Sequence, residues 1–164
     1  MKPFSKSEIK IISTVLVVLI LLVTVNMLTS LRRGRDSTRK NDISSIQKGL
    51  DSYKQKYSVY PPSTDDGRII GCFEGEVIQD KSTGIPLNNM VCEWGQSTFE
   101  GMSPMPRDPN AADGVNYKYI SIDKGYAFYV SLEGKDEPEY NLETLSLNLH
   151  CGDKICNYGR EVLK

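Results

Sequence analysis

The sequence predicts an α+β fold in which one long N-terminal helix packs on a small antiparallel β-sheet. Three observations predict it. The first is an uncharged apolar run over residues 11–31, and the second is a stripe of apolar residues with helical spacing that continues to Tyr57. The third is a pair of aromatic and β-branched runs later in the chain, separated by three residues that end in Gly125.

The apolar run is long enough to cross a lipid bilayer as a helix. It reads IISTVLVVLILLVTVNMLTSL, without a charge, and about 20 such residues span the hydrocarbon. A helix that is apolar all round is hard to bury in a chain of 164 residues, and the run is longer than the core of a cleaved secretory signal. We therefore expect residues 1–10 to be a short cytoplasmic, leader-like segment and residues 11–31 to be a retained transmembrane helix.

The helical pattern continues beyond the apolar run as an amphipathic segment over residues 32–60. Apolar residues recur there at spacings of three and four, which places them on one face of a helix. These residues are Ile43, Ile46, Leu50, Tyr53 and Tyr57. The pair Pro61-Pro62 forbids helix beyond about Tyr60. One helix from near Ser5 to near Tyr57 is the resulting prediction.

The remaining chain divides into a variable loop region over residues 61–111 and a sheet with a cysteine loop over residues 112–164. The first part is rich in Gly, Asp, Asn, Ser and Pro, which is typical of connecting segments, and Trp94 is its expected packing anchor. In the second part, residues 117–122 and 126–132 predict a hairpin with a bulged three-residue turn.

The second strand of this hairpin is expected to place alternate side chains against the helix, with its other face wetter. The helix-facing side chains are Tyr126, Phe128, Val130 and Leu132. Alternation over residues 145–149 predicts a third strand.

Charge is distributed unevenly along the chain. Residues 1–40 carry eight basic and two acidic side chains, whereas the later residues carry 12 basic and 19 acidic ones, a net charge of −7. An acidic domain of this kind repels phosphate, so nucleic acid is not an expected partner.

The cysteines predict two disulfides in an oxidising compartment. The four are Cys72, Cys92, Cys151 and Cys156, with no C-x-x-C pair and a single histidine, which argues against zinc. Three pairings are open, and 72 with 92 and 151 with 156 is the local one. The basic residues after the apolar run would place the C-terminal part in the cytoplasm by the positive-inside rule, but the disulfides favour the opposite side.

An enzymatic function finds no support among the motifs. The sole histidine, His150, adjoins Cys151, and the chain has no Gly-x-Ser-x-Gly, phosphate-binding loop or H-E-x-x-H pattern. Four paired cysteines would leave no thiol nucleophile. We expect no catalytic residues.

Two stretches carry a resemblance to a known family. Residues 35–62, RDSTRKNDISSIQKGLDSYKQKYSVYPP, resemble the segment after the membrane helix in type IV pilin-like proteins, especially the major pseudopilins (G type) of type II secretion. The phrase Pro106-Arg107-Asp108-Pro109 before a Tyr-rich hairpin is also similar to that family. The resemblance implies a structural, non-enzymatic subunit that assembles with other pilin-like subunits from the membrane.

The resemblance also assigns roles to residues at the start of the chain. A prepilin peptidase cleaves family members after a glycine, and here Phe4 would be the first residue of the product and Glu8 the fifth. Pro3 stands where the family has glycine, and Lys6 and Lys10 add charge where the family is apolar. Glu8 is therefore either an assembly residue that pairs with a neighbour's new amino terminus or an interfacial charge partnered by Lys6 or Lys10.

Pseudopilins of the type II class, which the chain resembles, often hold a structural calcium ion in the loop after the second strand of the sheet. The candidate ligands are Asp136, Glu137 and Glu139, although an acidic solvated loop is the preferred interpretation, with no other cofactor.

Two functions follow from the sequence. The first is a membrane-anchored pilin-like or pseudopilin subunit of the cell envelope with its C-terminal domain at the cell surface or in the periplasm. The second is a tethered extracytoplasmic binding module that does not polymerise.

Overall fold

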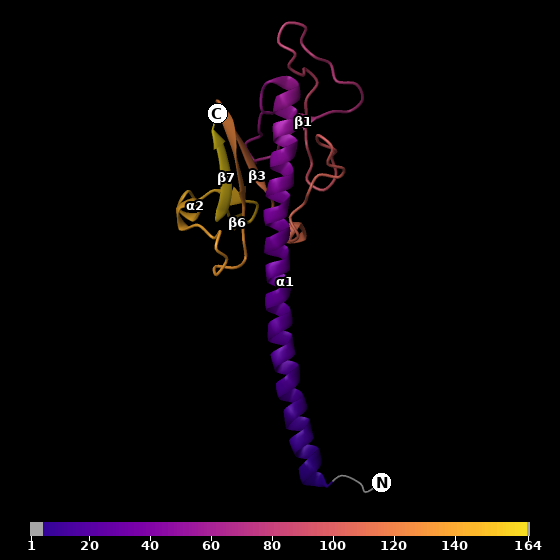
Figure 1. The fold of residues 1–164 in the computed structure, drawn as a ribbon, viewed down its shortest axis with the longest axis vertical. Coiled ribbons are helices and arrows are strands. Elements are labelled where there is room, and N and C mark those ends of the chain that lie inside the picture. The colour runs from indigo at the N-terminus through magenta and orange to yellow at the C-terminus, as the bar shows by residue number, and fades with distance from the viewer. Residues whose placement is uncertain (1–4, 164) are drawn as a thin grey trace. The chain divides into compact units, whose positions relative to one another are not determined.

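A computed structural model describes residues 5–163 and confirms the predicted α+β class (Figure 1). Two helices, one 3-10 turn and seven short strands follow one another in this part of the chain. They are α1 (Lys6–Tyr57), β1 (Ile70–Cys72), β2 (Met90–Val91), η1 (Ala111–Asp113), β3 (Lys118–Ile122), β4 (Gly125–Val130), α2 (Leu142–Ser146), β5 (His150–Cys151), β6 (Lys154–Ile155) and β7 (Tyr158–Leu163).

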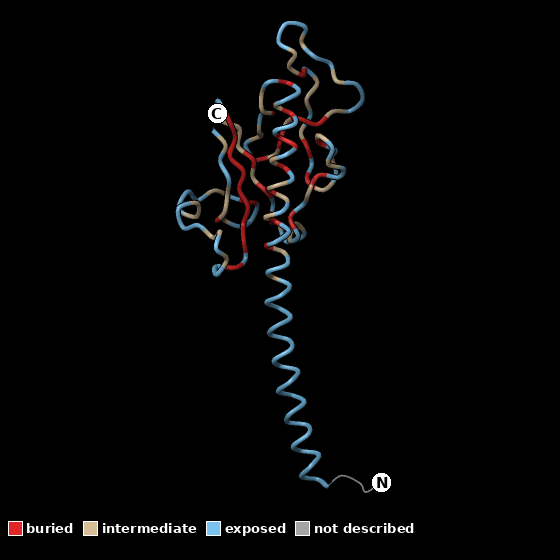
Figure 2. The backbone as a smooth tube through the Cα atoms, viewed as in Figure 1, coloured by how far each residue is buried: buried red, intermediate tan, exposed pale blue. Residues whose placement is uncertain are grey.

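The chain divides into two compact units, residues 1–35 and residues 36–164, and α1 contributes to both. From Lys6 to Leu31 the helix is exposed on all sides, as the pale blue trace of Figure 2 shows. Its large apolar side chains from Ile11 to Leu31 are 49–67% exposed. By length and composition α1 is able to cross a membrane, and its apolar window has no buried residue.

Both ends of α1 are fixed by local hydrogen bonds. At its start the amide of Glu8 donates to Ser5 Oγ (3.3 Å) and the amide of Ser5 donates to Glu8 Oε2 (2.7 Å), which is a capping box. At its end Ser58 adopts a left-handed conformation (φ 64°) and its amide donates to the carbonyl of Lys54 (2.7 Å). The helix therefore stops at Tyr57, as the sequence predicted.

The second unit packs the predicted stripe of α1 against a three-stranded antiparallel sheet of order β3-β4-β7. Figure 1 shows this half of α1 between the sheet and the loops that carry β1. Tyr126, Phe128 and Val130 on β4 belong to the same core cluster as Ile43, Ile46 and Leu50 on α1. The sequence predicted this face of the sheet correctly.

Three features of the sheet differ from the predictions: the length of the hairpin turn, the exposure of the outer face of β4 and the identity of the third strand. The hairpin turn has two residues, Asp123 and Lys124, because Gly125 already pairs with Ile122. A Cβ on Gly125 would lie 1.7 Å from the carbonyl oxygen of Val162, so glycine permits β7 to pair beside the turn. The other face of β4 is not wet, since Ala127 and Tyr129 are buried with the Cys151–Cys156 disulfide.

The third strand is the C-terminal β7 instead of residues 145–149. Those residues overlap α2, whose N-cap Asn141 accepts hydrogen bonds from the amides of Glu143 and Thr144. An asparagine cap before Leu142 and Leu145, three residues apart, favours a helical turn over the strand that alternation predicted. Strand β7 then pairs with β4 along its whole length, from Tyr158 opposite Val130 to Leu163 opposite Gly125.

Candidate functional site

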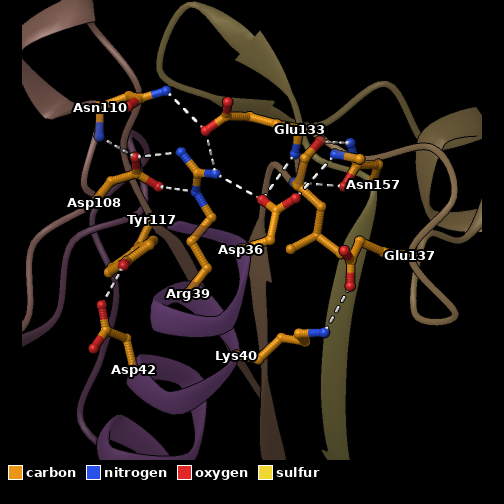
Figure 3. Close-up of polar contacts among 12 residues, drawn as sticks. Asp36, Arg39, Lys40, Asp42, Asp108, Asn110, Tyr117, Glu133, Glu137 and Asn157 are labelled. Atoms are coloured by element: carbon orange, nitrogen blue, oxygen red, sulfur yellow. Dashed lines mark hydrogen bonds and ion pairs between the residues drawn. The ribbon is translucent and has the colours of Figure 1, made fainter. Parts of the chain in front are cut away.

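A buried ionic cluster lies where α1 enters the second unit (Figure 3). The guanidinium of Arg39 donates from Nε and Nη2 to both carboxylate oxygens of Asp108, at 2.8 and 2.9 Å. Its Nη1 donates to Asp36 Oδ1 and to Glu133 Oε1, each at 2.8 Å. Arg39, Asp36 and Asp108 are almost completely buried. The cluster joins α1, the segment before η1 and the loop after β4.

Asp36 also fixes the backbone of the loop that follows β4. Its carboxylate oxygens accept hydrogen bonds from the amides of Glu133 and Gly134, both at 2.9 Å. Burial of the Arg39 guanidinium lowers its pKa, but the hydrogen bonds from Arg39 to Asp108 and Glu133 outweigh burial and hold that pKa above its ordinary value. The arginine is therefore a permanent cation that holds three carboxylates from different parts of the unit.

Sequence reasoning missed this cluster, although a signal for it was present. The stripe of α1 extends backward from Ile43 through Arg39 to Asp36 at the same spacings of four and three. Charged residues on the buried side of a helix need partners, because an unpaired buried charge is strongly unfavourable. Asp108 belongs to the stretch Pro106-Arg107-Asp108-Pro109 that resembles the pilin-like family, and in the structure it pairs with Arg39.

A second polar contact one turn along α1 completes the site. The hydroxyl of Tyr117 donates a hydrogen bond to Asp42. Burial raises the pKa of Asp42, and the hydrogen bond from Tyr117 opposes that rise only partly. Burial and the neighbouring carboxylate raise the pKa of Tyr117 as well, so the phenol stays protonated. This hydrogen bond ties the residue just before β3 to α1.

Two of the candidate calcium ligands, Glu137 and Glu139, form an ion pair with a lysine. Lys40 Nζ donates to Glu137 Oε2 at 2.9 Å and to Glu139 Oε2 at 3.1 Å. Within residues 5–163, Asp136, Glu137 and Glu139 do not form a group of three ligands able to hold a metal ion. The ammonium group of Lys40 lies on the oxygens that a cation in this loop would require.

The two candidates for processing, Pro3 and Phe4, lie outside the described residues. Glu8 is described, and its partner is Ser5 rather than Lys6 or Lys10. The hydrogen bonds from the amide and hydroxyl of Ser5 lower the pKa of the Glu8 carboxyl. Glu8 thus has a local role at the start of α1, and S-x-x-E spacing is the signal that predicts it.

The cysteines form the local pair of disulfides. Cys72 bonds to Cys92 and Cys151 bonds to Cys156, so no described cysteine is a free thiol. The first disulfide closes the base of the excursion over residues 73–91, and the second covers the outer face of β4. His150 is exposed on the two-residue strand β5.

An open cleft of about 470 Å³ lies beside Trp94 on the second unit. Arg68 pairs across its edge with Asp66 and Glu93. Trp94 itself is 9% exposed and packs edge-on against Tyr117 and Phe128, and its Nε1 has no hydrogen-bond partner within residues 5–163. Other lining residues are Gln96, Arg107, Asn116 and Gly152. Polar and charged side chains therefore make up most of the lining of this cleft.

The fold and these contacts define a class of protein. It has an N-terminal helix with an apolar, exposed first part and a disulfide-bonded α+β unit built on the second part of that helix. No family model, no curated protein and no solved structure matches the chain.

Proposed function

We propose that the protein is a membrane-anchored, pilin-like structural subunit whose C-terminal unit lies outside the cytoplasm. The observation that carries the proposal is the change of environment along α1. Its residues 11–31 are apolar and exposed, whereas its continuation from Asp36 to Tyr57 forms the centre of the second unit. Such a helix can be held in lipid at one end and carry a folded unit at the other.

The two disulfides support the placement outside the cytoplasm. Disulfides persist in oxidising compartments and are rare in the cytosol. Both close local loops in the second unit, of separation 20 and 5 residues. They outweigh the basic residues after the apolar run, which taken alone favour the opposite orientation.

Stacking of the apolar helices supplies the contact that would hold such subunits together. Within the bilayer, helices associate by van der Waals packing and hydrogen bonds between helices. The acidic second units would then form the surface of the assembly, as expected of a pilus-like or type II secretion pseudopilus-like structure. The ionic cluster around Arg39 fixes the second unit on α1 at the point where the helix enters it.

A tethered binding module that does not polymerise is the second candidate. The cleft beside Trp94 favours it, because a polar cleft on an anchored domain can present a site to a ligand. The local role of Glu8 in the capping box and the proline at position 3 favour it as well.

Two measurements on cells that express the full chain test these proposals. Protease added outside the cytoplasmic membrane should digest the second unit, and digestion only after membrane lysis would contradict the proposed location. Mass spectrometry of the mature amino terminus then separates the candidates. A chain that begins at Phe4 supports assembly, whereas one that begins at Met1 or Lys2 supports the tethered module.

A further inference from the structure

The polar side chains of the apolar run fall into two groups. Three threonines satisfy their hydroxyl groups within α1 by donating to a carbonyl one turn earlier. Thr14 donates to Lys10 (2.9 Å), Thr24 to Ile20 (3.1 Å) and Thr29 to Val25 (3.1 Å). These residues can lie in hydrocarbon without any partner from outside the helix.

The side chains of the second group have no such hydrogen bond within residues 5–163, and Asn26 is the largest of them. Its carboxamide offers two donors and one acceptor, and it bonds to no other group in the part of the chain that the structure describes. Side chains on a helix tilt toward the N-terminus, so this group points into the apolar run and away from the nearer boundary at Leu31. An unbonded amide in hydrocarbon is strongly unfavourable.

We propose that Asn26 hydrogen-bonds to Asn26 of a second copy of this chain and so pairs two α1 helices inside the bilayer. The inference rests on the proposed membrane span. Two copies inserted in the same direction bring the same residue to the same depth. A carboxamide both donates and accepts, so two of them can form a reciprocal pair where lipid offers neither group.

The neighbours of Asn26 on the same face of α1 suit a close approach of two helices. Ser30 and Gly34 follow at intervals of four residues, which places all three on one side of the helix. Small residues four apart allow helix backbones to approach closely in membranes. Apart from its chain neighbours and the adjoining helix backbone, a Cβ at Gly34 would meet no atom of residues 5–163 within 4 Å, so packing against other described segments does not account for glycine there.

A second copy fits this face better than other occupants. Lipid tails have no hydrogen-bonding groups, and an unrelated helix would have to present an amide at the same depth. The threonine hydroxyls cannot form the same reciprocal bond, because the donor of each is already engaged within its own helix. The reciprocal bond therefore selects pairs of identical chains in the same orientation.

The test uses the full chain in dodecyl maltoside micelles, with donor or acceptor dye on the amino terminus and energy transfer as the readout. Asn26→Leu should raise the dissociation constant of the pair about three- to twentyfold, from the measured range for hydrogen bonds between membrane helices. The matched control is Thr24→Val, which removes a hydroxyl already bonded within the helix and should leave the constant unchanged. Asn26→Gln keeps the carboxamide and should retain most of the association.

The outcomes distinguish a failure of the Asn26 pairing from a failure of the proposed membrane span. Unchanged association in Asn26→Leu, equal weakening in Thr24→Val, or a wild-type chain that stays monomeric at every detergent ratio would overturn the pairing. Extraction of the wild-type chain from membranes by alkaline carbonate would instead overturn the span and the proposed function. Resistance to carbonate together with the predicted order of the variants supports both.

Discussion

The two halves of α1 place the same kinds of side chain in opposite environments. Leu19 in the first half is 53% exposed, whereas Leu50 in the second half is fully buried. The backbone is helical throughout, so the difference comes from the pattern of apolar residues. Apolar residues on all sides leave the first half without partners in the chain, while a stripe on one side lets the second half build a core.

The halves also satisfy their polar groups in different ways. In the first half, threonine hydroxyls bond to the carbonyls of the helix itself. In the second half, Asp36 and Arg39 bond to residues almost 70 to 100 positions away in sequence, at Asp108, Glu133 and Gly134. Substitutions should therefore affect association or insertion in the first half and folding of the unit in the second.

Removal of the arginine from the ionic cluster should have the largest effect. Arg39→Ala leaves the carboxylates of Asp36 and Asp108 buried without their cation, and breaking a buried ion pair from one side costs about 3–5 kcal/mol. The measurement is urea unfolding of the full chain in micelles, followed by the fluorescence of Trp94, the single tryptophan.

Arg160→Ala is the matched control for this cluster. Its guanidinium is exposed and bonds to Gln47 on α1, so the expected loss is below about 1 kcal/mol. Equal losses of unfolding free energy in the two variants would show that the cluster stabilises the unit no more than a surface contact does. The two halves of α1 would then not differ in how strongly they depend on charged contacts.

Truncation of matched leucines compares the two halves directly. Leu50→Ala removes a fully buried side chain from the core and should lower the free energy of unfolding by about 2–5 kcal/mol. Leu19→Ala makes the same chemical change in the exposed half and should leave the unfolding of the second unit unchanged. Urea titration with Trp94 fluorescence measures both, and a loss in Leu19→Ala comparable to that in Leu50→Ala would contradict the division of α1.

Local patterns in the sequence were sufficient to predict the helix and the hairpin. The stripe from Ile43 to Tyr57 and the pair Pro61-Pro62 predicted the C-terminal end of α1, because helical spacing and proline sterics act over a few residues. Loop length favoured Cys72–Cys92 and Cys151–Cys156 among the three pairings, and the structure has both bonds.

Contacts distant in sequence were not predictable in the same way. Alternation over residues 145–149 wrongly predicted a strand, since an asparagine cap and the pairing of β4 with β7 decided the local structure instead. The dry outer face of β4 depends on where the loop with Cys151 folds back, which no local pattern encodes. The partners of Arg39 likewise come from segments that only the complete fold brings together.

Loss of a disulfide should have an intermediate effect confined to the second unit. Cys72→Ser with Cys92→Ser opens a loop of 20 residues, for which chain entropy predicts a loss of about 3 kcal/mol. Cys151→Ser with Cys156→Ser opens a separation of 5 residues and should cost about 1 kcal/mol less. Unfolding of both double variants tests this order, whereas helix pairing through the first half should remain at the wild-type level.

The smallest effect should come from the half-buried carboxyl of Asp42. Burial raises its pKa above the ordinary 3.8, so the folded unit favours the protonated form. The contribution of Asp42 to stability is therefore greatest below pH 3.8 and is lost as the pH rises through the pKa of the folded state. Asp42→Asn keeps an acceptor for Tyr117 and removes the ionisation.

The stability of Asp42→Asn relative to wild type should consequently increase from pH 3 to pH 7. Arg39 stays charged and Tyr117 stays protonated over this range, because the pKa of each is raised. The other carboxylates of the cluster contribute to both chains, so the difference between the two unfolding free energies isolates Asp42. Residues 11–31 contain no charged side chain, so the pairing of the first halves should not follow this pH dependence. A relative stability that is constant or falls over the same range would mean that Asp42 gains more from Tyr117 and Arg39 than it loses by burial.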